Sequence, residues 1–77
     1  MSLEKQQREI FKKVFRIADE DIRPDLKEGD IPQWDSLGHR NLLMEIEKSF
    51  GVKFSIEEVS KLRTFEDILK CLEDKLS

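Results

Sequence analysis

The sequence predicts an all-α fold, a four-helix bundle with three longer helices, a short third helix and a long loop between the first two. Apolar residues recur every three or four positions in three separate stretches, which is the period of an amphipathic helix. Lys and Glu are abundant, and 40% of the residues are charged. The 77 residues are enough for one domain, which we expect to span 1–77.

Composition and charge exclude several classes of function. No apolar run approaches the roughly 20 residues that a membrane span needs, and we expect no signal peptide, because the N-terminal residues lack the required order. The net charge of −3 argues against a nucleic-acid-binding protein, whose surface is basic. The single cysteine, Cys71, cannot form an internal disulfide. We therefore expect a cytoplasmic protein. We also expect a monomer.

The first helix is predicted over residues 3–18, with Ser2 as its N-cap. One face carries an apolar stripe in which Gln7 fills a missing turn: Leu3, Ile10, Phe11, Val14, Phe15 and Ala18. The outer face carries five cations: Lys5, Arg8, Lys12, Lys13 and Arg16. We interpret this face as solvated, with a surface for a partner or an acidic lipid as the alternative.

Residues 19–35 show no helical period and contain two prolines and a glycine. Loops of this length are uncommon in compact domains and are usually functional or mobile. We expect four apolar side chains to fasten the loop to the bundle: Ile22, Leu26, Ile31 and Trp34. Its acidic residues lack the spacing of a calcium-binding loop, so the sequence predicts no metal site.

The second helix is predicted to begin at Asp35 or Ser36 and to end near Phe50, with Gly51 as its left-handed stop. Ser55 and Glu58 form a capping-box pattern that opens a short helix over 56–62. The apolar face of this short helix is expected to consist of Ile56, Val59 and Leu62. Thr64 then caps the last helix, whose apolar stripe is Phe65, Ile68, Leu69, Leu72 and Leu76.

Ser36 stands at a helix N-terminus, where unpaired backbone N–H groups and the helix dipole attract phosphate. Local sequence alone favours a simple cap, and our hypothesis is nevertheless that a phosphate is covalently attached here. His39 lies one turn after Ser36, but a catalytic triad also needs an orienting group and an oxyanion site, so we predict no enzyme. We interpret His39 as a partly buried packing residue, with a contact to the phosphate as the alternative.

The tripeptide Asp35-Ser36-Leu37 and the segment LLMEIEKSFG over 42–51 resemble the attachment motif and second helix of acyl carrier proteins. The resemblance covers roughly residues 3–76. It implies that 4′-phosphopantetheine from coenzyme A is esterified to Ser36 by a phosphopantetheinyl transferase. It also implies that acyl groups travel as thioesters on this arm between acyl-loading and acyl-transferring enzymes, without catalysis by the carrier itself.

The resemblance also assigns two further sets of residues. The surface that partner enzymes recognise is expected to comprise Asp35, Leu37, Arg40, Asn41, Met44 and Glu47. The acyl pocket is expected to be lined by Leu42, Ile46, Phe50, Leu62 and Ile68. Met44 is expected to be exposed, because a flexible thioether suits varied docking surfaces.

Some residues depart from the acidic second helix of fatty-acid-synthesis carriers, namely Gly38, His39, Arg40, Asn41 and Lys48. Together with Trp34, they resemble dedicated carriers of specialised fatty-acid or polyketide-type pathways. Two alternatives remain open at this stage. One is an aminoacyl or peptidyl carrier with the same arm, and the other is an unmodified helical interaction module.

Overall fold

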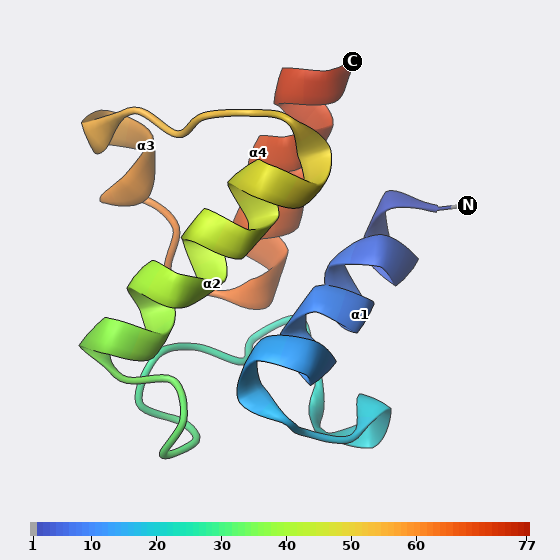
Figure 1. Cartoon of the computed structure of the whole chain (residues 1–77), viewed down its shortest axis with the longest axis vertical. Helices are drawn as coiled ribbons and strands as arrows, with labels where there is room; N and C mark the ends of the chain where they lie inside the picture. The colour runs from blue at the N-terminus through green and yellow to red at the C-terminus, as the bar shows by residue number, and fades with distance from the viewer. Residues whose placement is uncertain (1) are drawn as a thin grey trace.

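The computed structural model describes residues 2–77, and within them it contains four α-helices and a short 3-10 turn over Asp19–Asp21 (Figure 1). The helices are α1 (Leu3–Phe15), α2 (Ser36–Phe50), α3 (Ile56–Val59) and α4 (Phe65–Leu76). Figure 1 shows α2 crossing in front of α4, with α1 on one side and the short α3 on the other. The predicted all-α bundle with a short third helix and a long first loop is confirmed.

Local side chains set most helix ends, as the sequence predicted. The Ser2 hydroxyl accepts a hydrogen bond from the Lys5 backbone N–H at 3.2 Å, and Gly51 ends α2 in the left-handed region at a φ of 67°. Capping boxes open α3 at Ser55 and α4 at Thr64. The start of α2 is resolved in favour of Ser36 as its first residue, with Asp35 as the N-cap.

Two predicted helix ends are wrong. The first helix was expected to reach residue 18, but it stops at Phe15 because Arg16 adopts a left-handed conformation with a φ of 56°. Ala18 therefore lies outside the helix and is exposed.

The short third helix was expected over 56–62, but it ends at Val59 after a single turn. Ile56 is 90% exposed and Val59 is also exposed, so only Leu62 of the predicted apolar face is buried. Leu62 reaches the core through the turn that follows the helix, where its N–H bonds to the Val59 carbonyl at 3.1 Å.

An aromatic cluster fastens the long loop to the bundle. The Trp34 ring is fully buried, with its centroid 5.2 Å from that of Phe11 and 5.3 Å from that of Phe15. Ile22 and Leu26 are buried as predicted, whereas Ile31 is only half-buried. The loop that leads into α2 is therefore held by the same core that holds the helices.

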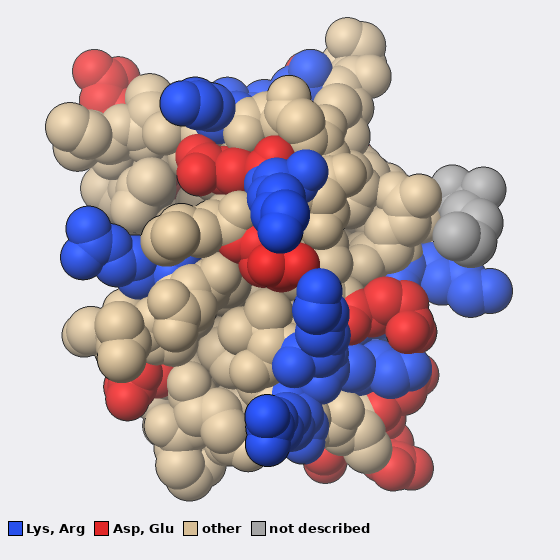
Figure 2. Space-filling view, in the orientation of Figure 1, with Lys and Arg blue, Asp and Glu red and all other residues tan. Residues whose placement is uncertain are grey.

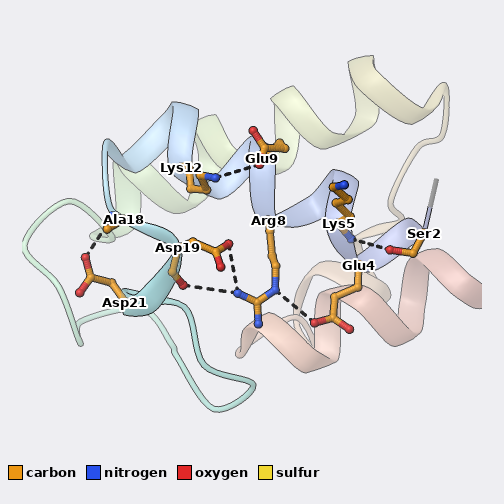
Figure 3. A network of polar contacts seen from close by, with 9 residues as sticks. All are labelled: Ser2, Glu4, Lys5, Arg8, Glu9, Lys12, Ala18, Asp19 and Asp21. Atoms are coloured by element: carbon orange, nitrogen blue, oxygen red, sulfur yellow. Dashed lines mark hydrogen bonds and ion pairs between the residues drawn. The ribbon is translucent and has the colours of Figure 1, made fainter.

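The outer face of α1 is largely neutralised within the molecule. Arg8 pairs with Glu4 at 3.1 Å and with Asp19 at 3.3 Å (Figure 3), and Lys13 pairs with Glu45 of α2 at 2.9 Å. In Figure 2, acidic and basic side chains gather in a band between α1 and α2. These pairs favour the solvated-face interpretation of α1. In residues 2–77, no helix combines the length and apolar character that crossing a bilayer requires.

Candidate functional site at the N-terminus of α2

Asp35 holds the first turn of α2. Its carboxylate accepts a hydrogen bond from the Gly38 N–H at 2.7 Å, and its backbone carbonyl accepts one from the His39 N–H at 2.8 Å. An N-cap of this kind satisfies donors that would otherwise lack partners. The predicted recognition residue Asp35 is thus engaged in fixing the helix start, while its side chain remains exposed.

Position 38 requires glycine, because the first turn of α2 packs closely against the turn that precedes the helix. A Cβ at this position would overlap the backbone carbonyl oxygen of Gln33, in the turn that leads into α2. Only glycine fits without moving that turn. The sequence interpretation treated Gly38 as a missing acidic residue, because a contact five residues back along an irregular segment leaves no periodic signal.

Ser36 is the first residue of α2, and it is exposed. Its hydroxyl donates to a Glu28 carboxylate oxygen at 3.4 Å, which is long for an O–H···O bond and therefore weak. The oxygen is thus accessible to an incoming donor and is held by no strong competing contact. An exposed hydroxyl at a helix N-terminus fits the covalent attachment of a phosphate-linked group.

His39 is paired with Trp34 and not with Ser36. The Trp34 indole N–H donates to His39 Nδ1 at 2.9 Å, and the two rings stack with centroids 5.9 Å apart. Burial lowers the pKa of His39, and the Glu28 carboxylate partly opposes this shift. Because Nδ1 is the acceptor, the neutral ring carries its proton on Nε2. The half-buried ring agrees with the packing role inferred from the sequence.

A surface hollow of about 510 Å³ lies beside this helix start. It is lined by Lys27, Glu28, His39, Val59, Ser60, Leu62 and Arg63. The polar members come from three segments that the fold brings together: the loop before α2, the first turn of α2, and the chain after α3. Glu28 connects the hollow to Ser36, since its carboxylate both lines the hollow and accepts the serine hydroxyl.

The residues expected to line an acyl pocket occupy two places. Leu42, Ile46 and Ile68 are fully buried and Leu62 is 3% exposed, so these four belong to the core. Phe50 is half-buried at the margin of that core and lines a separate surface groove between α1 and the end of α2. The structure therefore brings together four of the five residues.

The expected recognition residues also divide into two groups. Leu37 is 67% exposed and Met44 is 59% exposed, and Arg40 and Asn41 are exposed as well. Glu47 is half-buried, and its carboxylate accepts the Phe54 N–H at 2.8 Å, so it holds the segment that follows α2.

Ile56 is an exposed apolar residue that the sequence analysis named only as part of the apolar face of the short third helix. Its side chain leaves 90% of its surface exposed. The exposure of Ile56 could have been inferred from its position directly after the Ser55 cap. The first side chain of this one-turn helix points away from the bundle. Across residues 2–77, no three metal-ligating side chains cluster.

Comparison with known proteins identifies the family. No family model matches the chain. A curated relative from Thermosynechococcus vestitus (strain NIES-2133 / IAM M-273 / BP-1), named acyl carrier protein, is 35% identical over 78 aligned residues, which cover 92% of this chain and 96% of the relative. Acyl carrier proteins are carriers and not catalysts. On the strength of this near full-length match and the helical bundle, the chain belongs to the acyl carrier protein family.

Proposed function

We propose that this protein carries acyl intermediates as thioesters on a 4′-phosphopantetheine arm attached to Ser36, in a specialised fatty-acid or polyketide-type pathway of the cytoplasm. The observation that carries the proposal is the exposed Ser36 hydroxyl at the first position of α2, within Asp-Ser-Leu. The arm, when attached, supplies the thiol that holds the acyl group. Tethering raises the effective concentration of the cargo at a docked enzyme.

Attachment needs only one bond to this chain. Ser36 Oγ forms the bond to phosphorus while the bond between the two phosphates of coenzyme A breaks, and adenosine 3′,5′-bisphosphate leaves. The serine proton passes to a base of the phosphopantetheinyl transferase. Asp35 keeps the helix start in place through its bond to the Gly38 N–H, so the oxygen stays presented to the transferase.

The exposed face of α2 supports docking of the transferase and of acyl-loading and acyl-transferring enzymes. Leu37 and Met44 offer apolar contact, while Arg40 adds a cation where fatty-acid-synthesis carriers are acidic. A basic enzyme patch that suits an acidic helix would be repelled by Arg40, which favours a dedicated set of partner enzymes. An aminoacyl or peptidyl carrier would use the same arm and differ in its cargo.

The test is to incubate the protein with coenzyme A and a broad-specificity phosphopantetheinyl transferase and to measure its intact mass. We expect the mass to rise by one phosphopantetheine. Ser36→Ala abolishes this rise, and the matched change Ser49→Ala, at an exposed serine near the end of the same helix, preserves it. Because Asp35 and not Ser36 is the N-cap, both variants keep the helical circular-dichroism spectrum. An unmodified mass, under conditions that load a control carrier, would refute the proposal.

A further inference from the structure

The hollow beside Ser36 is lined by two cations and a histidine, all of which are hydrogen-bond donors. We propose that Lys27, Arg63 and the Nε2–H of His39 hold the phosphate oxygens of the attached arm. The arm then starts from a fixed position over the hollow and does not rotate freely about the serine. This inference rests on the proposed function and adds to it a binding role for three residues that the Asp-Ser-Leu motif does not include.

Backbone contacts place the two cations on neighbouring segments. Lys27 and Thr64 form an antiparallel β-bridge, and the Phe65 N–H donates to the Leu26 carbonyl at 2.9 Å. The loop before α2 and the chain before α4 are therefore joined where Lys27 and Arg63 lie. These backbone contacts fix where the main chain carries Lys27 and Arg63. The two cations are therefore held near each other before any anion binds.

Both cations are free to take an anion. In residues 2–77, neither Lys27 nor Arg63 forms a side-chain ion pair, in contrast to Arg8 and Lys13 on α1. The one carboxylate in the lining is Glu28, and it faces the Ser36 hydroxyl at 3.4 Å. A phosphate on Ser36 would meet Glu28 with like charge and displace it, leaving two cations beside the new anion.

The phosphate would lie at the edge of the hollow, because it is bonded directly to Ser36 Oγ, and that oxygen already contacts a residue of the lining. His39 supplies a directional donor there. Its Nδ1 is occupied by the Trp34 N–H, and no hydrogen bond among the described residues uses Nε2. A charge-assisted hydrogen bond from Nε2–H to a phosphate oxygen would satisfy that group.

The test compares the melting temperature before and after attachment of the arm in the wild type and in two double variants. The test variant is Lys27→Gln/Arg63→Gln. The matched control, Lys48→Gln/Lys53→Gln, removes the same charge from exposed positions that do not line the hollow. Intact mass first confirms that each sample is loaded.

We expect the change in melting temperature on attachment to be more favourable in the wild type than in Lys27→Gln/Arg63→Gln by about 2–4 °C at low salt, as for exposed ion pairs in a domain of this size. The control should behave like the wild type, and high salt should shrink the difference. The ³¹P resonance of the attached phosphate should shift in the test variant, and exchange of the His39 Nε2 proton should slow on attachment.

Equal changes in melting temperature and an unaltered ³¹P resonance in loaded Lys27→Gln/Arg63→Gln would overturn the inference while leaving the carrier function intact. Failure of Ser36 to load would refute both together. A difference that arises only when the thiol carries a dicarboxylic acyl group, and not an acetyl group, would assign the cations to the cargo carboxylate and overturn the phosphate assignment.

Discussion

At the scale of single residues, the exposure of the Ser36 hydroxyl depends on neighbouring residues of the chain. Asp35 ties down the first turn of α2, and Gly38 lets the preceding turn approach the helix closely. Ser36 is left with one long contact to Glu28. The exposed serine is thus a consequence of how the chain enters the helix.

The variant Gly38→Ala tests whether the turn before α2 packs closely against the first turn of the helix. Alanine is the better helix former by about 1 kcal/mol, so on propensity alone the variant should be more stable. Because the added Cβ would overlap the Gln33 carbonyl oxygen, we expect instead a loss of about 1–3 kcal/mol in unfolding free energy, as in other overpacked sites. Urea unfolding measures this, with the exposed α2 residue changed in Asn41→Ala as a control within about 0.5 kcal/mol. A stabilised Gly38→Ala would contradict the close approach.

The pH dependence of His39 gives a second prediction. Burial lowers its pKa from the ordinary value of 6.5, so the unfolded chain binds a proton at a higher pH than the native one does. Stability is therefore unaffected by this group above pH 6.5 and falls as the pH decreases from 6.5 toward the lowered pKa. Protonation also removes the Nδ1 acceptor from the Trp34 N–H.

Trp34 reports this change directly, because it is the only tryptophan and the chain has no tyrosine. Urea midpoints followed by its fluorescence should fall more steeply below pH 6.5 in the wild type than in His39→Gln, whose side chain does not titrate. His39 is the single histidine, so no other imidazole contributes. Parallel pH profiles for the two proteins would contradict the lowered pKa of His39.

At the scale of elements, the one-turn helix α3 is held by a single carboxylate. Glu58 accepts the Ser55 N–H at 2.8 Å, which completes the capping box. It also pairs with Lys75 of α4 at 2.8 Å. Since a helix of four residues is unstable alone, these two contacts fix the start of α3 and tie this helix to α4.

Hydrogen bonding to Lys75, followed by that to the Ser55 backbone, lowers the pKa of Glu58 to about 2 from its ordinary value of 4.5. A depressed carboxyl pKa contributes stability that is present above pH 4.5 and is lost as the pH falls from 4.5 toward 2. Glu58→Gln should therefore be less stable than the wild type at neutral pH, and the gap in urea midpoint should close over this range. The neighbouring variant Glu57→Gln is the control. If the difference in urea midpoint between the wild type and Glu58→Gln does not depend on pH, the ionised Glu58 carboxylate does not hold α3 in place.

At the scale of the whole molecule, the sequence predicted those features that local chemistry determines. Ser55 with Glu58, Thr64 and Gly51 mark helix ends through contacts within a few residues, and these were predicted correctly. The reciprocal contact of Thr64 with Asp67 was not predicted. The early end of α1 was not predicted either, because Arg16 is neither glycine nor asparagine and its left-handed conformation has no sequence signal.

The surroundings of Ser36 were less predictable than Ser36 itself. Glu28 reaches it from eight residues away through an irregular loop, and His39 meets Trp34 across the boundary between loop and helix. Neither contact follows the period of a helix, so apolar patterning gives no indication of it. The hollow depends in addition on the pairing of Lys27 with Thr64, which only the folded chain brings together.

The last prediction concerns the core of the bundle, which is closed to solvent. Leu42, Ile46 and Ile68 have no exposed surface, so an acyl chain can enter only by separating the helices that bury them. Ile68→Ala removes buried methyl groups and should cost about 2–5 kcal/mol in the protein without cargo. If the cargo fills the core, an octanoyl group on the arm should restore part of that loss, because the chain occupies the space left by Ile68.

The measurement is the rise in melting temperature on octanoyl loading, which should be larger in Ile68→Ala than in the wild type. Leu69→Ala is the matched control, because Leu69 is the adjacent residue of α4 and lines a surface groove with Pro24 and Glu66, away from the predicted pocket. Its melting temperature should rise on loading only as much as that of the wild type. Equal rises in all three proteins would mean that the chain stays outside, and Leu42, Ile46 and Ile68 would then be core residues with no part in holding cargo.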